Sequence, residues 1–151
     1  MIPLALDKLI EQWKADAPIN KIDPDKDLLN IPNLHAKYAA ELVAHSTALK
    51  KKTREFLTLK KTRTLYYTGK MSQEDLEMFG LKPFPHVVKG TFMKGDVNVW
   101  LDGDHDLNAL KATLDDHEEA IELCKMIVRQ IQDRTWQIKS FLDYSKYTLG
   151  V

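Results

Sequence analysis

Residues 107–145 read LNALKATLDDHEEAIELCKMIVRQIQDRTWQIKSFLDYS, and apolar side chains return in this stretch every seven residues. One position of the repeat holds Leu107, Leu114, Ile121, Val128, Thr135 and Leu142, and the other holds Leu110, His117, Cys124, Ile131, Ile138 and Ser145. Neither Gly nor Pro interrupts the repeat. This pattern is typical of a helix that packs lengthwise on other helices. We therefore predict a long helix within residues 104–151, capped at its start by Asp104 and Asp106.

A neighbouring position of the repeat adds Ala120, Ile127 and Phe141, so the apolar face is wider than a two-stranded coiled coil needs. A helix of about 40 residues is roughly 60 Å long, too long for one small domain to cover. We therefore predict a homo-oligomer larger than a dimer, held by this helix. The predicted contact residues are Leu107, Leu110, Leu114, Ile121, Cys124, Val128, Ile131, Ile138 and Leu142. Packing within the chain against an upstream helix is the alternative, and both can occur together.

The upstream residues 1–103 predict more helices and a small β element. Leu6, Leu9, Ile10 and Trp13 share one face of a short helix over about residues 4–15. A second long helix is expected over 33–67, starting near Asn30-Ile31-Pro32 and capped by Thr68-Gly69. Val87-Val88 and Val97–Leu101 have strand-like composition on either side of a glycine-containing loop. The predicted fold class is mainly α, with this β element in the middle and an oligomerisation helix at 104–151.

Charge is strongly segregated along the chain although the formal total is zero. Residues 45–70 hold eight Lys/Arg and one Glu, a net charge of +7. Residues 1–44 carry a net −2 and residues 71–151 a net −5. A local charge of this size beside Tyr66-Tyr67 favours an anionic polymer with stackable rings, which means nucleic acid.

Aromatic rings can stack only on bases that a duplex does not hide, so the pattern points to single strands. The predicted DNA-binding residues are Lys50, Lys51, Lys52, Arg54, Lys60, Lys61, Arg63, Tyr66, Tyr67 and Lys70. The competing interpretation is a solvated basic helix face with Tyr66 or Tyr67 packed in the core. Basic residues near a helix C-terminus also complement the helix dipole.

Other functional classes find little support. Asp102–Asp106 begins like a calcium loop, but Leu107 stands where glycine is needed and Thr113 where a bidentate Glu belongs. The sequence has no phosphate-binding glycine loop, no His-Glu-x-x-His motif and only one cysteine, Cys124, which we expect in a core. These absences do not exclude an enzyme, but nothing in the sequence argues for one, and we predict no metal or cofactor. The N-terminal apolar run is too short for a signal peptide and no stretch approaches a membrane span, so we expect a cytoplasmic protein.

Two separated regions resemble the UvsY family of phage recombination mediators. Residues 59–69 resemble its basic-aromatic motif, with Lys61, Arg63, Tyr66, Tyr67, Thr68 and Gly69 in register and Lys60 at the family's leucine position. The C-terminal helix resembles the family in the spacing of Asp104, Asp106, Cys124, Ile131, Arg134, Trp136, Ile138, Lys139 and Asp143.

This resemblance implies a non-catalytic protein that binds single-stranded DNA as a ring-like homo-oligomer, a hexamer or heptamer. It implies two protein partners, a RecA-like recombinase and the phage single-strand DNA-binding protein that the recombinase replaces, and a place in the host cell cytoplasm. Lys61 and Arg63 correspond to the family's DNA-binding lysine and arginine. The alternative function is a helical oligomeric adaptor for an acidic protein, and a small nuclease is a third.

Overall fold

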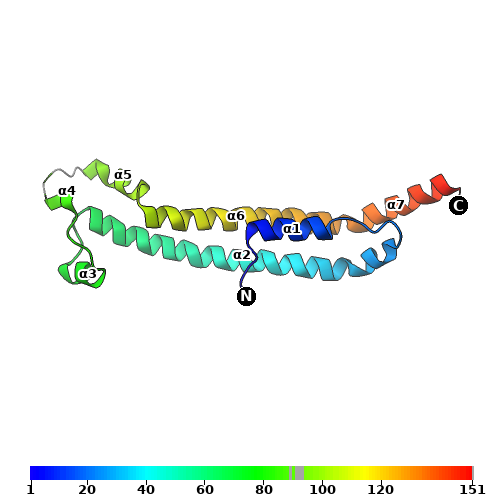
Figure 1. Ribbon diagram of the computed structural model, residues 1–151, viewed down its shortest axis with the longest axis horizontal. Helices are drawn as coiled ribbons and strands as arrows, with labels where there is room; N and C mark the ends of the chain where they lie inside the picture. The colour runs from blue at the N-terminus through cyan, green and yellow to red at the C-terminus, as the bar shows by residue number, and fades with distance from the viewer. Residues whose placement is uncertain (89, 91–93, 151) are drawn as a thin grey trace. The chain divides into compact units, whose positions relative to one another are not determined.

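The computed structural model describes residues 1–88, 90 and 94–150, which form helices and turns and contain no strand (Figure 1). The mainly helical fold class is confirmed. The elements are α1 (Leu6–Asp16), α2 (Pro24–Tyr67), α3 (Gln73–Met78), α4 (Pro85–Val88), the 3₁₀ turn η1 (Lys94–Asp96), α5 (Val97–Asp102), α6 (His105–Gln132) and α7 (Arg134–Leu149). Within the described residues, no helix combines the length and the apolar character needed to cross a membrane.

The chain divides into two compact units, and both α2 and α6 contribute to each. The first unit comprises Met1–Leu49 and Asp116–Val151, and the second comprises Lys50–Asp115. The second unit contains every residue that the sequence predicts to bind DNA. The expected division between residues 103 and 104 falls just before α6, which begins at His105.

The core of the first unit joins α1, α2 and α6. Its buried members are Leu9, Leu34, Tyr38, Ala120, Cys124, Ile127 and Ile131. The four from α6 follow one another at intervals of four, three and four residues, so one seam of the apolar stripe packs inside the chain. Cys124 is fully buried, as predicted for a core residue. Burial raises the pKa of its thiol to about 11, which disfavours the reactive thiolate.

Arg134, at the start of α7, ties this helix to the end of α1. Its buried guanidinium donates to the carbonyl oxygen of Ala17 at 2.9 Å and to those of Asp16 and Pro18 at 3.3 Å. Asp16 is the last residue of α1 and the other two residues follow it, at the end where a helix leaves carbonyl acceptors without partners. Hydrogen bonds from the Arg134 guanidinium therefore fix the end of α1. This role explains why an arginine occurs at position 134 of the C-terminal segment that resembles the UvsY family.

Two histidines meet beside the core of the first unit. The Nδ1 atoms of His45 and His117 lie 3.0 Å apart, so one ring must donate a proton and the other accept it. Burial lowers the pKa of His45 and the neighbouring His117 lowers it further, which keeps the buried ring of His45 neutral at pH 7. His117 therefore occupies its place in the apolar repeat as one half of a hydrogen-bonded pair.

The second unit begins in the basic part of α2 and turns sharply after Tyr67. Gly69 has a φ of +72°, and the N–H of Lys70 donates to the carbonyl of Leu65 at 2.9 Å, which confirms the predicted C-cap. A Cβ on Gly69 would lie 2.5 Å from a methyl carbon of Val87. Glycine is therefore needed at this position for its backbone conformation and for its close contact with α4.

The predicted β element is wrong. Val87 and Val88 lie in α4, and Val97–Leu101 lies in α5. The loop predicted between the two strands includes residues 89 and 91–93, which are outside the described residues. Helical turns let Leu101 become buried and Trp100 pack its ring on Tyr67 and Phe84, without a strand partner to satisfy the backbone.

Two further expectations about helix ends also differ from the structure. α2 begins at Pro24 and contains Pro32 in its interior, so the second long helix starts earlier than Asn30-Ile31-Pro32 suggested. Proline suits the first turn of a helix, and Pro24 fills that place here. The C-terminal helix pauses at Asp133 between α6 and α7, although its N–H still donates to the carbonyl of Arg129 at 3.2 Å.

Candidate nucleic-acid interface

The basic part of α2 presents most of its cations to solvent. Exposed side chains are Lys50, Lys51, Arg54, Lys60 and Lys61 on the helix and Lys70 just after it. Lys52 is half-buried and forms a salt bridge with Glu55 at 2.9 Å. Solvated lysines and arginines can neutralise phosphates and release the counterions condensed on DNA. The structure therefore keeps most of the predicted cations accessible to a strand.

The exposed cations lie on more than one side of α2. Lys50, Arg54, Leu57 and Lys61 follow one another at intervals of four, three and four residues, so they share one face of the helix. We call this face the basic stripe. Lys60 points elsewhere and lines a small hollow of about 400 Å³ with α5 and α6 residues Leu101, Asp102, Leu107, Asn108 and Lys111, and with Phe56 of α2. The basic stripe thus places three exposed cations, Lys50, Arg54 and Lys61, on one face of α2.

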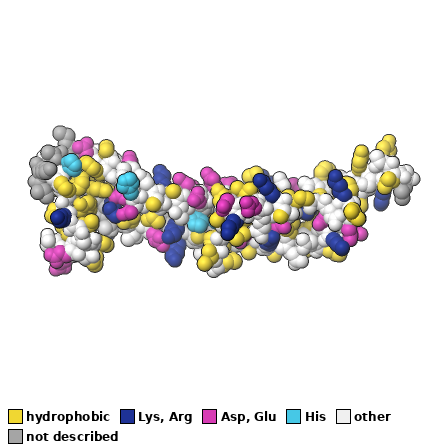
Figure 2. Space-filling model, viewed as in Figure 1, with side chains coloured by type: hydrophobic (Ala, Val, Ile, Leu, Met, Phe, Trp, Pro, Cys, Tyr) yellow, Lys and Arg dark blue, Asp and Glu magenta, His cyan; other side chains and the backbone are white. Residues whose placement is uncertain are grey.

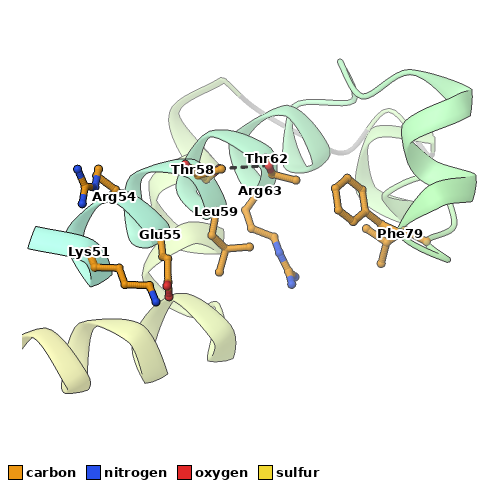
Figure 3. A pocket seen from close by; sticks show the side chains of 9 residues that line it. Lys51, Arg54, Glu55, Thr58, Leu59, Thr62, Arg63 and Phe79 are labelled. Carbon is orange, nitrogen blue, oxygen red and sulfur yellow. Dashed lines mark hydrogen bonds between the residues drawn. The ribbon is translucent and has the colours of Figure 1, made fainter. Parts of the chain in front are cut away.

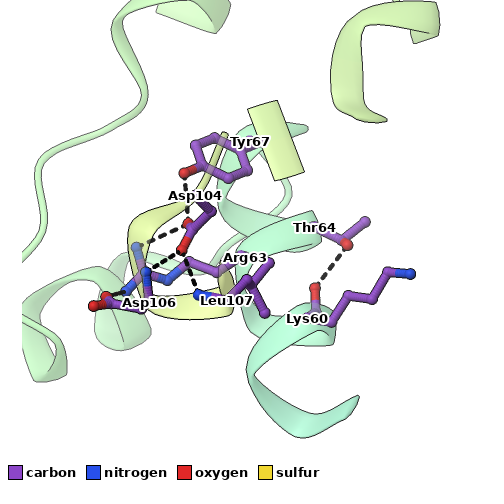
Figure 4. Close-up of polar contacts among 7 residues, drawn as sticks. All are labelled: Lys60, Arg63, Thr64, Tyr67, Asp104, Asp106 and Leu107. Carbon is purple, nitrogen blue, oxygen red and sulfur yellow. Dashed lines mark hydrogen bonds and ion pairs between the residues drawn. The ribbon is translucent and has the colours of Figure 1, made fainter. Parts of the chain in front are cut away.

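Arg63 is held by two acidic residues at the start of α6 (Figure 4). Its Nη1 donates to Asp104 Oδ2 at 3.3 Å and its Nη2 donates to Asp106. The side chain of Arg63 is 23% exposed and that of Asp104 only 2%. A buried carboxylate needs such partners because its burial is otherwise costly. Arg63 therefore neutralises Asp104 in this structure, whereas Lys61 is exposed to solvent.

Asp104 collects two further kinds of hydrogen bond. Its Oδ1 accepts from the backbone N–H groups of Asp106 and Leu107, both at 3.0 Å, which caps α6. Its Oδ2 also accepts from the Tyr67 hydroxyl at 2.7 Å. We call Arg63, Tyr67, Asp104 and Asp106 the carboxylate cluster. It joins the basic-aromatic segment to the Asp-x-Asp segment.

The pKa values in the carboxylate cluster follow from these contacts. Burial alone would raise the pKa of Asp104, but Tyr67, the Leu107 N–H and Arg63 together hold it below its ordinary value of 3.8. Stability from this carboxylate is therefore full above pH 3.8 and is lost as the pH falls through the lowered value. Burial, aided by the bond to Asp104, raises the pKa of Tyr67 to about 12.

The predicted stacking tyrosines lie in an aromatic cluster with Phe84 and Trp100. The Tyr66 ring centroid lies 5.6 Å from that of Phe84, and the Tyr67 centroid lies 5.0 Å from Phe84 and 6.3 Å from Trp100. Both tyrosines are half-buried. Their rings already pack against other rings, as in the alternative interpretation in which they lie in a core.

A groove missed by the sequence analysis runs beside α2. It has a volume of about 630 Å³ and lies between α2 and the residues that follow α3 (Figure 3). Its lining residues are Lys51, Arg54, Glu55, Thr58, Leu59, Thr62, Arg63, Phe79 and Leu81. The α2 residues recur at helical spacing, but Phe79 and Leu81 come from a short segment that carries no sequence motif.

The predicted oligomer contacts differ in how far the single chain buries them. Leu107, Cys124, Ile131 and Ile138 are buried, whereas Leu110, Leu114, Ile121, Val128 and Leu142 are half-buried. Beyond these, α7 exposes Trp136, Tyr144 and Tyr147, and Figure 2 shows hydrophobic side chains at the surface of this C-terminal segment. Residues 136, 144 and 147 fall on one side of a helix, and we call them the aromatic stripe.

Metal binding receives no support from the arrangement of side chains. Among the described residues, no group of three or more His, Cys, Asp or Glu is placed to hold a metal ion. The Asp102–Asp106 segment is explained by the cap that Asp104 gives to α6 and by the Arg63 contacts.

We predict that removing the carboxylate cluster destabilises the protein. Asp104→Ala should lower the free energy of unfolding by about 2–4 kcal/mol, because it removes the cap of α6 and leaves the Tyr67 hydroxyl without its acceptor, while Arg63 keeps Asp106. Tyr67→Phe removes one hydrogen bond and should cost about 1–3 kcal/mol. Denaturant unfolding measures both, with Tyr144→Phe on the exposed face of α7 as a control expected within about 0.5 kcal/mol. Equal stability of all three variants would contradict the assignment.

Comparison with known proteins identifies the family to which the chain belongs. A family described as "Recombination, repair and ssDNA binding protein UvsY" matches residues 12–151. No curated protein and no solved structure gives a significant match. The family match covers nearly the whole chain, well beyond the two segments that carry the resemblance. The chain therefore belongs to the UvsY family of recombination, repair and single-stranded-DNA-binding proteins.

Proposed function

We propose that this protein is a recombination mediator, which binds single-stranded DNA and helps a RecA-like recombinase to load onto strands covered by a single-strand DNA-binding protein. It does this without a catalytic step of its own, as a homo-oligomer in the cytoplasm of the host cell. The single observation that carries the proposal is the exposed basic stripe of α2 in a chain of the UvsY family.

Electrostatics explains why the basic stripe suits a strand of any sequence. Lys50, Arg54 and Lys61 repeat along the helix, so successive phosphates can meet successive cations. Such contacts position the backbone but read no bases. A mediator must act wherever a coated strand occurs, and a sequence-independent site meets that need.

Assembly of several chains would strengthen a site that is weak in one copy. Linked copies raise the effective concentration of DNA at each remaining site, and overall avidity can increase by roughly 10² to 10⁴ without a new contact. The aromatic stripe and the half-buried residues of the repeat offer apolar surface for self-association. A strand held on several copies would be bent or spread, which would loosen its protein coat before the recombinase arrives.

We predict that the basic stripe sets the salt dependence of DNA binding. Lys50→Ala/Lys61→Ala should weaken binding to a single-stranded oligonucleotide and make the log–log salt slope shallower by about 1.4, since each lost phosphate contact is worth about 0.7. Fluorescence anisotropy across a salt series measures both quantities. Lys139→Ala/Lys146→Ala, on exposed positions of α7, is the control.

An unchanged slope in the Lys50→Ala/Lys61→Ala protein would remove the stripe from the DNA site. Arg63 is a poor choice for this test, because its replacement also breaks the carboxylate cluster. A protein that binds no oligonucleotide even at low salt would contradict the proposed function as a whole.

We also predict that the aromatic stripe contributes to assembly. Trp136→Ser/Tyr147→Ser should reduce the molar mass measured by light scattering, because it removes exposed apolar surface without opening the core. Met126→Ser, an exposed apolar position on α6, serves as the control. Changes at Val128 are less informative, since that residue packs against the core of its own chain. A 17.4 kDa particle before any substitution would contradict assembly.

A further inference from the structure

The groove of Figure 3 has one wall that is fixed by a helix end. Phe79 is the C-cap of α3, and its N–H donates to the carbonyl of Asp75 at 3.0 Å. Gly80 follows with a φ of +65°, and the N–H of Leu81 donates back to Leu76 at 2.8 Å. This is the hydrogen-bond pattern of a glycine-terminated helix. It holds Phe79 and Leu81 in place before any ligand arrives.

The short helix α3 is anchored at both ends. The Ser72 hydroxyl accepts a hydrogen bond from the N–H of Asp75 at 3.2 Å and caps its start. Leu76 is buried and lines a small hollow together with Tyr66 and Phe84. The aromatic cluster thus supports α3 from behind, and α3 presents Phe79 to the groove.

Phe79 is the exposed aromatic ring of this groove. The residue is 51% exposed, and Figure 3 shows its ring directed toward α2, with the Leu59 and Arg63 side chains reaching into the same space. The Thr62 hydroxyl donates to the Thr58 carbonyl at 3.1 Å, so this hydroxyl needs no hydrogen bond from a ligand in the groove. An exposed ring beside aliphatic side chains is suited to a flat, apolar ligand face.

The charges around the groove favour an anionic ligand. Arg63 is already neutralised by Asp104 and Asp106, and the groove's acidic residue, Glu55, is paired with Lys52. Lys51 and Arg54 remain exposed at its edge. Arg54 also belongs to the basic stripe, so a strand lying on that stripe would pass beside the groove.

We propose that the groove is a base-stacking site, in which an unpaired base of the bound strand lies against Phe79 while Lys51 and Arg54 hold the neighbouring phosphates. The inference rests on the proposed function and assigns its stacking contact. Unpaired bases offer an apolar face next to a charged backbone, which matches an aromatic wall next to two cations. Phe79 would thereby fill the role that the sequence suggests for Tyr66 and Tyr67, whose rings contact Phe84.

The experiment compares two strands of equal length, one intact and one made of abasic nucleotides, which keeps the phosphates and removes the bases. Fluorescence anisotropy gives the affinity of the unsubstituted protein, of Phe79→Ala and of Met78→Ala. Met78 is an exposed neighbour outside the groove lining, and it controls for loss of apolar surface near α3. Circular dichroism checks that each variant keeps its helices.

We expect Phe79→Ala to bind the intact strand about fivefold or more weakly, with an unchanged salt slope, because stacking on one ring is worth that much or more. The unsubstituted protein should prefer the intact strand, and Phe79→Ala should lose most of that preference. Met78→Ala should behave like the unsubstituted protein. Lys51→Ala, by contrast, should weaken binding to both strands.

The groove proposal fails if Phe79→Ala keeps the full preference for the intact strand. In that case, binding of DNA by the unsubstituted protein would leave the proposed function standing, and the groove would be free for another occupant such as an acidic peptide. If the unsubstituted protein binds neither strand, the proposed function and the groove proposal are both overturned.

Discussion

The second unit depends on the contacts that the Asp104 carboxylate makes. It caps α6, receives the Tyr67 hydroxyl and pairs with Arg63, so one buried negative charge joins the end of α2 to the start of α6. A charge this deeply buried is tolerated only when all its lone pairs are used, and here four donors surround it. The aromatic cluster that supports α3, and with it Phe79, is built on the same Tyr67.

The sequence suggests DNA binding for every residue of the basic-aromatic segment. The contacts with Asp104 show that some of these residues have a structural role instead. Arg63 and Tyr67 maintain the fold, whereas Lys50, Arg54 and Lys61 remain in solvent. The presence of Tyr66-Tyr67 alone thus does not distinguish a DNA-binding protein from an adaptor for an acidic partner. The family match and an exposed ring bordered by cations give the better argument for single-stranded DNA.

The sequence predicts the helices well because their apolar spacing is determined by packing along the helix axis. It identifies the Gly69 cap, the buried Cys124 and the basic part of α2 for the same local reasons. The β element was wrong because the short segment Val97–Leu101 forms a helix, which satisfies its own backbone and packs the Trp100 ring on Phe84 in the aromatic cluster. Phe79 was missed because its importance depends on a turn at Gly80 that places it opposite residues some twenty positions earlier in the chain.

The central claim is that Phe79 and the exposed cations of α2 meet the strand while Tyr66 and Tyr67 serve the fold. Ultraviolet crosslinking of the protein to a single-stranded oligonucleotide, followed by mass-spectrometric mapping of the crosslinked peptides, tests this most directly. The account predicts adducts at Phe79 and in the peptides around Lys51 and Arg54. Adducts at Tyr66 or Tyr67, with Phe79 unmodified, would contradict it.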